Sequence, residues 1–231
     1  MSSPTKAIDI NGLRFAYGKD RPNVLDIPRF ELNNGESCFL HGPSGCGKTT
    51  LLGIIAGVLK GTGDVQVLGN TLSQCSGAQR DAWRGANIGY IFQMFNLIPY
   101  LSVRDNILLP CRLHKARRDK EAPEAACRRL AAALDIEGLL DRGVLELSVG
   151  QQQRVAAARA LIGTPALVIA DEPTSALDTA HRESFLQLLR SQCSLAGSAL
   201  LFVSHDQSIA NLFDRRQSLP ELNLAAQRRG A

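Results

Sequence analysis

The sequence lacks the features that would embed it in a membrane or send it to an oxidising compartment. None of its apolar runs approaches the length needed to cross a bilayer. The N-terminus has no apolar segment of the kind found in secretory signals. The six cysteines are scattered, with no C-x-x-C pair and no zinc-ligand spacing, which indicates reduced thiols. We therefore expect a cytoplasmic protein that only a partner would hold at a membrane.

The sequence also has little excess of basic over acidic residues. The formal net charge of +4 is too small to indicate a nucleic-acid-binding protein. Basic residues concentrate between positions 112 and 129, where Asp119, Glu121 and Glu124 are interleaved. This segment either faces anionic lipid or, as we favour, is the solvated face of helices. The 45% hydrophobic and 21% charged residues are typical of an ordinary globular protein with one large domain.

The most specific motif is a phosphate-binding loop. Residues 42 to 49 read Gly-Pro-Ser-Gly-Cys-Gly-Lys-Thr, which fits G-x-x-x-x-G-K-[ST]. A short apolar strand precedes it and a helix follows, so backbone N–H groups and the helix N-terminus can face phosphates. We expect Lys48 to contact the β- and γ-phosphates and Thr49 to hold Mg²⁺. The predicted nucleotide contacts here are Gly42, Pro43, Ser44, Gly45, Cys46, Gly47, Lys48, Thr49 and Thr50.

One cysteine lies inside this loop. Cys46 is near the start of the following helix, where the pKa of a thiol tends to fall. One hypothesis is therefore a reactive thiol that ATP protects. The simpler interpretation, which we favour, is a small residue that fits the loop.

The rest of the chain alternates between strand and helix patterns. Strands are predicted at residues 7–17, 24–32, 64–68, 88–92, 166–170 and 199–203, and helices at 50–56, 122–134, 152–161 and 182–190. This alternation favours an α/β fold with a mainly parallel sheet. The pattern in the middle of the chain predicts a helical subdomain at about residues 94–160. The tail from Gln217 to Ala231 is polar and predicts a frayed end.

A second phosphate-site element ends the strand at 166–170. Its apolar run is followed by Asp171 and Glu172. Ligands of open α/β sheets bind beyond the carboxyl ends of the strands. Asp171 therefore suits Mg²⁺, and Glu172 can poise a water for attack on the γ-phosphate.

Taken together, the motifs resemble the ATP-binding subunits of ABC transporters over nearly the whole chain. Residues 147 to 151, Leu-Ser-Val-Gly-Gln, are similar to the family signature. The other matches are Gln93 for the glutamine loop, Ser175 to Asp178 for the loop after the catalytic strand, His205 for the switch histidine and Tyr17 for the aromatic that stacks on adenine. The resemblance implies the ABC ATPase fold across residues 1–231, with a phosphate-loop core, an N-terminal antiparallel β subdomain and the inserted helical subdomain.

The resemblance also implies a mechanism. Two copies would close head to tail on two ATP molecules, with Mg²⁺ held by Thr49, Gln93 and Asp171. Lys48, Glu172 and His205 would serve catalysis. Ser148, Gly150, Gln151 and Asp178 would reach the nucleotide or the dimer interface from the second copy. No nucleic-acid partner is expected.

Val149 departs from the family pattern, which has glycine there. If that position needs a positive φ, a β-branched residue is costly. Otherwise valine is harmless, and we expect activity to survive.

The segment at 91–103 looks like the subgroup that serves lipoprotein release and macrolide export. Such ATPases pair with integral-membrane permeases of few helices, of the FtsX-like type, which would hold the chain at the inner face of the cell membrane. The apolar residues are Met94, Phe95, Leu97, Ile98, Tyr100 and Leu101. They form either a docking groove for the permease or core. An alternative function is an ATPase that drives a membrane complex controlling an extracytoplasmic enzyme without transport.

Overall fold

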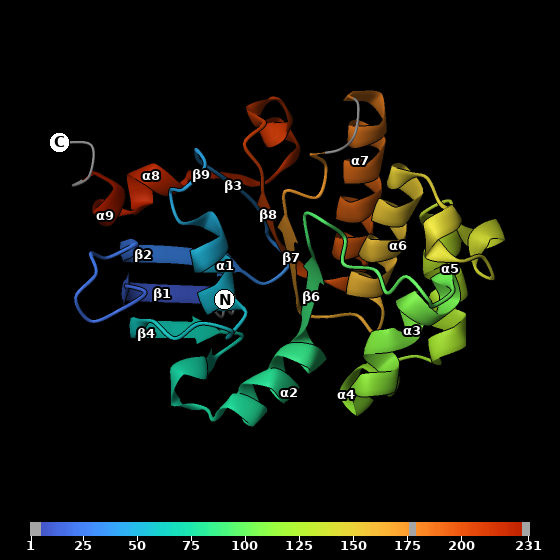
Figure 1. Ribbon diagram of the computed structural model, residues 1–231, viewed down its shortest axis with the longest axis horizontal. Coiled ribbons are helices and arrows are strands. Elements are labelled where there is room, and N and C mark those ends of the chain that lie inside the picture. Colours follow the sequence, from blue (N-terminus) through green and yellow to red (C-terminus); the bar gives the residue numbers. More distant parts are fainter. Residues whose placement is uncertain (1–5, 176–178, 228–231) are drawn as a thin grey trace, which may run out of the picture. The chain divides into compact units, whose positions relative to one another are not determined.

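The computed structural model describes residues 6–175 and 179–227 (Figure 1). The chain divides into two units. The first contains the residues up to Arg84 together with those from Leu201 onward. The second contains residues from Gly85 to Leu200. The predicted helical subdomain at 94–160 falls inside the second unit. That it is a separate subdomain inserted in the nucleotide-binding core stays a prediction.

The first unit begins with an antiparallel sheet of strand order β2-β1-β4-β5. Its strands are β1 (Lys6–Phe15), β2 (Leu25–Asn33), β4 (Thr62–Val67) and β5 (Asn70–Thr71). Side chains such as Ile8 and Ile10 are fully buried, whereas Asp9 and Asn11 between them are more accessible. This alternation follows from the two-residue period of a strand with one buried face.

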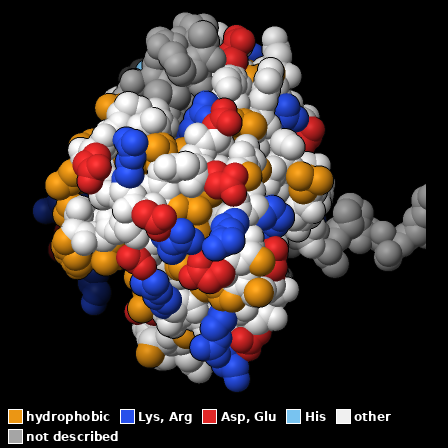
Figure 2. Space-filling model, turned by 90° about the vertical axis from the view of Figure 1, so that its right-hand side faces the viewer, with side chains coloured by type: hydrophobic (Ala, Val, Ile, Leu, Met, Phe, Trp, Pro, Cys, Tyr) orange, Lys and Arg blue, Asp and Glu red, His pale blue; other side chains and the backbone are white. Residues whose placement is uncertain are grey.

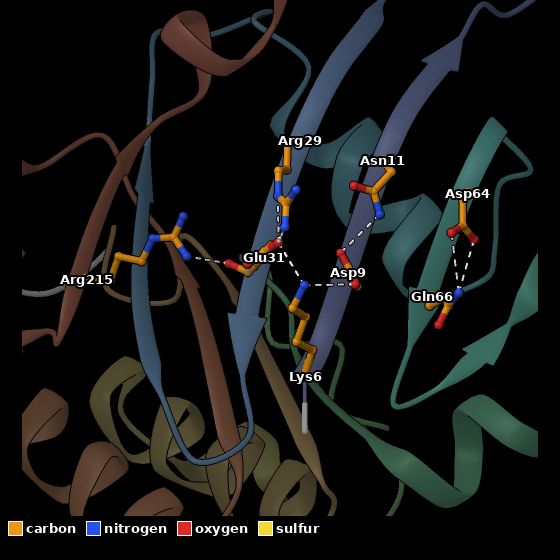
Figure 3. Close-up of polar contacts among 8 residues, drawn as sticks. All are labelled: Lys6, Asp9, Asn11, Arg29, Glu31, Asp64, Gln66 and Arg215. Atoms are coloured by element: carbon orange, nitrogen blue, oxygen red, sulfur yellow. Dashed lines mark hydrogen bonds and ion pairs between the residues drawn. The ribbon is translucent and has the colours of Figure 1, made fainter. Parts of the chain in front are cut away.

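Polar side chains cover the other face of this sheet (Figure 3). Lys6 on β1 pairs with Asp9 at 3.0 Å and with Glu31 on β2 at 2.8 Å. Hydrogen bonds from Lys6 and Arg29 hold the pKa of Glu31 below its usual value. Arg215 donates to the backbone carbonyl of Glu31 at 2.6 Å. Because these groups are accessible to solvent, we expect each pair to contribute little to stability.

The phosphate-binding loop joins a parallel strand pair to a helix in the same unit. Strand β3 (Ser37–His41) pairs in parallel with β9 (Arg215–Ser218), and α1 (Lys48–Ile55) follows the loop. The elements η1 (Leu72–Gln74), η4 (Gln207–Leu212), α8 (Leu219–Leu222) and α9 (Leu224–Gln227) complete the unit. Helix α2 (Gly77–Asn87) carries the chain into the second unit.

The second unit combines a parallel strand pair with most of the helices. Strand β6 (Ile88–Ile91) pairs in parallel with β7 (Leu167–Asp171). The helices are α3 (Val103–Leu113), α4 (Lys115–Arg118), α5 (Pro123–Ala133), η2 (Glu137–Leu139), η3 (Val144–Glu146), α6 (Val149–Leu161) and α7 (Thr179–Ala196). Strand β8 (Ala199–Val203) leads back to the first unit. The parallel pairs and the N-terminal antiparallel sheet confirm the predicted fold class.

The prediction of a frayed tail is wrong for the residues that the structure describes. Strand β9 and helices α8 and α9 occupy much of the segment from Gln217 to Gln227. Leu219 and Asn223 are completely buried, and Ala225 is nearly so. Apolar and hydrogen-bonded anchors therefore hold a segment whose composition alone predicts disorder.

Within the described ranges, no helix combines the length and the apolar character that a membrane span requires.

Candidate functional site

The phosphate-binding loop has the backbone geometry that its glycines predict. Gly45 and Gly47 have φ angles of 79° and 105°, a region that favours glycine. Gly47 is the residue immediately before α1, and a Cβ there would lie 2.8 Å from Leu25 Cδ2. The loop therefore turns directly into the N-terminus of a helix, where backbone N–H groups are available to an anion.

Lys48 is the first residue of α1 and is only 8% exposed. Its ammonium group donates to the carbonyl oxygens of Gly42 at 2.8 Å and Pro43 at 3.1 Å. Ser44 and Thr49 are exposed. The loop thus presents one cation, two accessible hydroxyls and a helix N-terminus, which suits a bound phosphate group.

Tyr17, the predicted adenine-stacking residue, lies beside this helix. Its hydroxyl hydrogen-bonds with the Thr50 hydroxyl at 3.0 Å. Its ring meets Phe15 edge-on, with the ring centres 4.9 Å apart. The Tyr17 side chain is 59% exposed, so its ring is available to a planar ligand.

Cys46 does not have the lowered pKa that the reactive-thiol hypothesis requires. Burial raises the pKa of its thiol above the ordinary value, although Lys48 and backbone N–H groups act in the opposite direction. A Cβ added at Gly42 would lie 2.7 Å from Cys46 Sγ. The structure therefore favours the simpler interpretation, a small side chain packed into the loop.

In the second unit, the predicted carboxylates and the glutamine come from the same edge of one strand pair. Ile91 of β6 is opposite Ala170 of β7. Asp171 ends β7, so Gln93 and Glu172 follow these parallel strands at matching positions. Burial, together with the charge of Asp171, raises the pKa of Tyr90 well above its usual range.

The backbone at Glu172 is unusual. Its φ of 45° lies in the left-handed region that non-glycine residues rarely adopt. Its carbonyl accepts a hydrogen bond from the Ser175 N–H at 3.3 Å, which closes a tight turn after β7. Strained backbone of this kind is concentrated at functional sites, and here it directs the residue that the sequence predicts as catalytic.

The predicted signature forms the start of α6. Ser148 caps the helix by accepting from the Gln151 N–H at 3.3 Å, and the Gln151 side chain accepts from the Ser148 N–H at 3.0 Å. Val149 is the first helical residue and is not among the residues with positive φ. The costly alternative for Val149 therefore does not apply, because a helical φ accommodates a β-branched side chain.

Of the two remaining predicted residues, the structure describes only His205. His205 follows β8 in the first unit and is exposed, immediately before the cap of η4, Asp206. Asp178 lies outside the residues that the structure describes.

The apolar stretch after Gln93 is part core and part surface. Phe95 is buried, and Leu97, Ile98 and Leu101 are half-buried. Met94 is 81% exposed and Tyr100 is 84% exposed. The core interpretation therefore applies to Phe95, and a docking surface stays a prediction for the exposed Met94 and Tyr100.

Sequence reasoning missed two side chains that hold these segments. Arg159 on α6 donates to the carbonyls of Phe95 at 2.5 Å and Asn96 at 2.6 Å, where both residues have positive φ. Asn223, in the tail, donates to the Cys46 carbonyl at 3.2 Å. No local pattern reveals these contacts, because Arg159 is at least 63 residues from its two partners here and Asn223 is 177 residues from Cys46.

Comparison with known proteins identifies the family. The profile described as ABC transporter matches residues 25–175. The lipoprotein-releasing system ATP-binding protein LolD 2 of Rhodospirillum rubrum is 38% identical over 92% of both chains. An uncharacterized ABC transporter ATP-binding protein of Mycobacterium tuberculosis is 41% identical over 87% of this chain and 81% of its own.

Solved structures agree with the sequence comparison. The dimeric structure of the bacterial ABC transporter cassette MJ0796 has a TM-score of 0.80 and 31% identity, covering 91% of this chain and 93% of that one. A post-hydrolysis state of the same cassette, bound to ADP and Pi, has a TM-score of 0.79 and 30% identity over 95% of both chains. The resemblance inferred from the motifs and the predicted ABC ATPase fold are confirmed. The chain belongs to the ABC transporter family, as one of its ATP-binding, ATP-hydrolysing subunits.

Proposed function

We propose that the chain is the motor subunit of a membrane transporter and that two copies close head to tail around two ATP molecules. The observation that carries this proposal is the strained Glu172, which leaves β7 at the same edge as Gln93 leaves β6. A carboxylate and an amide at one strand edge suit the positioning of a water for attack on a γ-phosphate.

Each copy supplies the phosphate-gripping residues. Residues 42 to 50 hold the phosphates, with Lys48 as the cation, and Tyr17 stacks on the base. The Thr49 hydroxyl, the Gln93 carbonyl and the Asp171 carboxylate are hard oxygen donors of the type that Mg²⁺ prefers. The ion would lower the cost of negative charge on the transferred phosphoryl group.

The second copy completes the site. The start of α6 is accessible, with Ser148 exposed and Gly150 half-exposed. Its backbone N–H groups, with Ser148 and Gln151, would face the γ-phosphate bound to the opposite copy. His205 would stabilise charge in the transition state, and Asp178 would lie at the dimer interface. The dimeric MJ0796 cassette supports this arrangement by similarity.

Glu172→Gln tests the catalytic assignment. The amide keeps the shape of the side chain but cannot accept the proton of the attacking water. We expect ATP hydrolysis to fall by at least about 100-fold, as for loss of a general base. ATP should then trap a dimer that size-exclusion chromatography detects.

The control is Glu137→Gln, at an exposed position in η2. It should hydrolyse ATP as the unmodified chain does. Normal hydrolysis by Glu172→Gln would show that another group activates the water.

We further propose that the exposed part of the stretch after Gln93 docks a permease of few transmembrane helices, of the FtsX-like type. Met94 and Tyr100 are large, apolar and exposed, as a docking surface requires. The Arg159 hydrogen bonds fix the backbone between them. The lipoprotein-releasing relatives support this class of partner, which would place the chain at the inner face of the membrane.

Tyr100→Arg and Met94→Arg test the docking surface. Both side chains are exposed, so the variants should fold and hydrolyse ATP alone at the unmodified rate. We expect co-purification with the permease to fall by about tenfold, since loss of an aromatic anchor commonly costs 1–2 kcal/mol or more.

Leu113→Arg and Leu195→Arg are matched controls, because these leucines are 67% and 78% exposed in the same unit. They should retain the permease. Equal retention by all four variants would contradict the docking proposal.

A further inference from the structure

The end of the described chain packs on the phosphate-binding loop. Strand β9 ends at Ser218, opposite His41, the last residue of β3 before the loop. Helices α8 and α9 follow, with Asn223 between them. Asn223 is a polar residue that is completely buried, so its amide must find partners within the protein.

All of the hydrogen-bonding capacity of the Asn223 side chain is used. Its Oδ1 accepts from the Asp26 N–H at 2.8 Å and from the Ala225 N–H at 3.2 Å. Its Nδ2 donates to the carbonyl oxygens of Val24 at 2.9 Å and Cys46 at 3.2 Å. One side chain therefore joins the start of β2, the start of α9 and the phosphate-binding loop.

Apolar contacts reinforce the same arrangement. A Cβ added at Gly42 would lie 2.9 Å from Pro220 Cδ, so α8 closely covers the first glycine of the loop. A Cβ at Gly47 would lie 3.5 Å from the carbonyl oxygen of Val24, the same oxygen to which Asn223 donates. The loop is thus held at both of its ends by β2 and the tail.

The bond to Cys46 orients one particular peptide group. The carbonyl of Cys46 and the N–H of Gly47 belong to the same planar trans peptide, so they point in opposite directions. When Asn223 holds the carbonyl, the Gly47 N–H must point away from Asn223. Gly47 has a φ of 105° and little steric restriction of its own, so an external contact is needed to fix this peptide.

We propose that Asn223 is a positioning residue for ATP binding, which acts by fixing the Cys46–Gly47 peptide of the phosphate-binding loop. It does not touch the nucleotide. It keeps the loop in the conformation that presents N–H groups to the phosphates before ATP arrives. The binding step then does not have to order the loop, and affinity is higher for that reason.

Two substitutions at this position remove different hydrogen bonds. Asn223→Ala removes both the acceptor oxygen and the donor nitrogen of the side-chain amide. Asn223→Asp keeps an oxygen that can accept from the Asp26 N–H, but it removes the donor to both Val24 and Cys46. We expect both to raise the Kd for ATP and the KM about five- to tenfold, the usual effect of losing one hydrogen bond. The kcat at saturating ATP should stay within twofold.

Hydrogen exchange supplies a readout that does not depend on activity. Without nucleotide, amides of residues 42–48 should exchange faster in both variants than in the unmodified protein. If Asn223→Asp does not fold, Asn223→Ser, which is shorter and uncharged, makes the same test.

The control is Val67→Ala, which creates a cavity at a buried residue of β4 that lies opposite Ile8 of β1. It should lower the melting temperature without changing the Kd for ATP. The proposal is overturned if the Asn223 variants bind ATP with the unmodified Kd, or if Val67→Ala weakens ATP binding as much as they do.

Discussion

The first residue of α6 is Val149, where the family signature has a glycine. The residue is 47% exposed and has a helical backbone, so neither strain nor crowding opposes it. Ser148 caps the helix in front of it, and Gly150 remains. The substitution is therefore compatible with an intact helix N-terminus.

We predict that Val149→Gly changes the rate of ATP hydrolysis by less than about threefold, because the N–H groups of the first turn keep their positions. Stability should fall by about 0.3 kcal/mol, since glycine is a slightly poorer helix former than valine. Steady-state ATPase assays and urea unfolding measure the two effects. A gain in turnover of more than about tenfold, which corresponds to 1.4 kcal/mol of barrier, would show that valine slows the site.

At the scale of elements, a buried arginine on α4, Arg117, connects several segments of the second unit by hydrogen bonds. Arg117 is only 2% exposed. Its guanidinium donates to the carbonyls of Gly85 at 2.8 Å, Ala160 at 3.1 Å and Ile162 at 2.9 Å, and also to that of Ile88. The end of α2, the start of β6 and the end of α6 are thereby joined.

We predict that Arg117→Met lowers the free energy of unfolding by about 3 kcal/mol, because it leaves buried carbonyls without donors. Arg117→Lys should recover only part of this loss, since an ammonium lacks the planar fork of guanidinium. Arg118→Met is the matched control on the same helix, because the Arg118 side chain is 53% exposed. Its effect in urea unfolding should stay below about 0.5 kcal/mol. Equal stability of the Arg117→Met and Arg118→Met variants would refute the role of Arg117.

At the scale of the whole molecule, the surface charges are mixed. Acidic and basic side chains are interspersed on the face drawn in Figure 2. Arg104 pairs with Glu124 and Asp141, and Arg129 pairs with Glu121. Within the basic segment at 112–129, Arg118 and Arg129 are accessible and paired with acids as predicted, whereas Arg117 is buried, so the predicted solvated face holds for only part of the segment.

We predict that the chain alone does not sediment with anionic lipid vesicles at 150 mM salt, because paired charges create little net attraction. A variant that carries Asp119→Lys, Glu121→Lys and Glu124→Lys replaces all three acids of the segment with bases. It should bind the same vesicles in a manner that salt weakens. Salt-sensitive binding by the unmodified chain would show that this surface faces lipid.

A functional element can be predicted from the sequence where the residues that form it are neighbours in the chain. The loop at 42–49, the helix start at Ser148 and the strand end at Asp171 are each recognised from residues that are close together in the sequence. Sequence reasoning misses Asn223 and Arg117, because all of their side-chain hydrogen bonds except the one between Asn223 and Ala225 join residues 29 to 199 positions apart. Phe95 escapes for another reason, since hydrophobicity alone does not distinguish a buried ring from an exposed one.

Under the catalytic role proposed for Glu172, its left-handed backbone opposes stability to activity. Glycine, asparagine or aspartate would occupy that conformation with less strain than glutamate does. None of them offers a carboxylate of the same reach. Selection for thermal stability alone would therefore favour loss of the glutamate, and only selection that includes turnover would retain it.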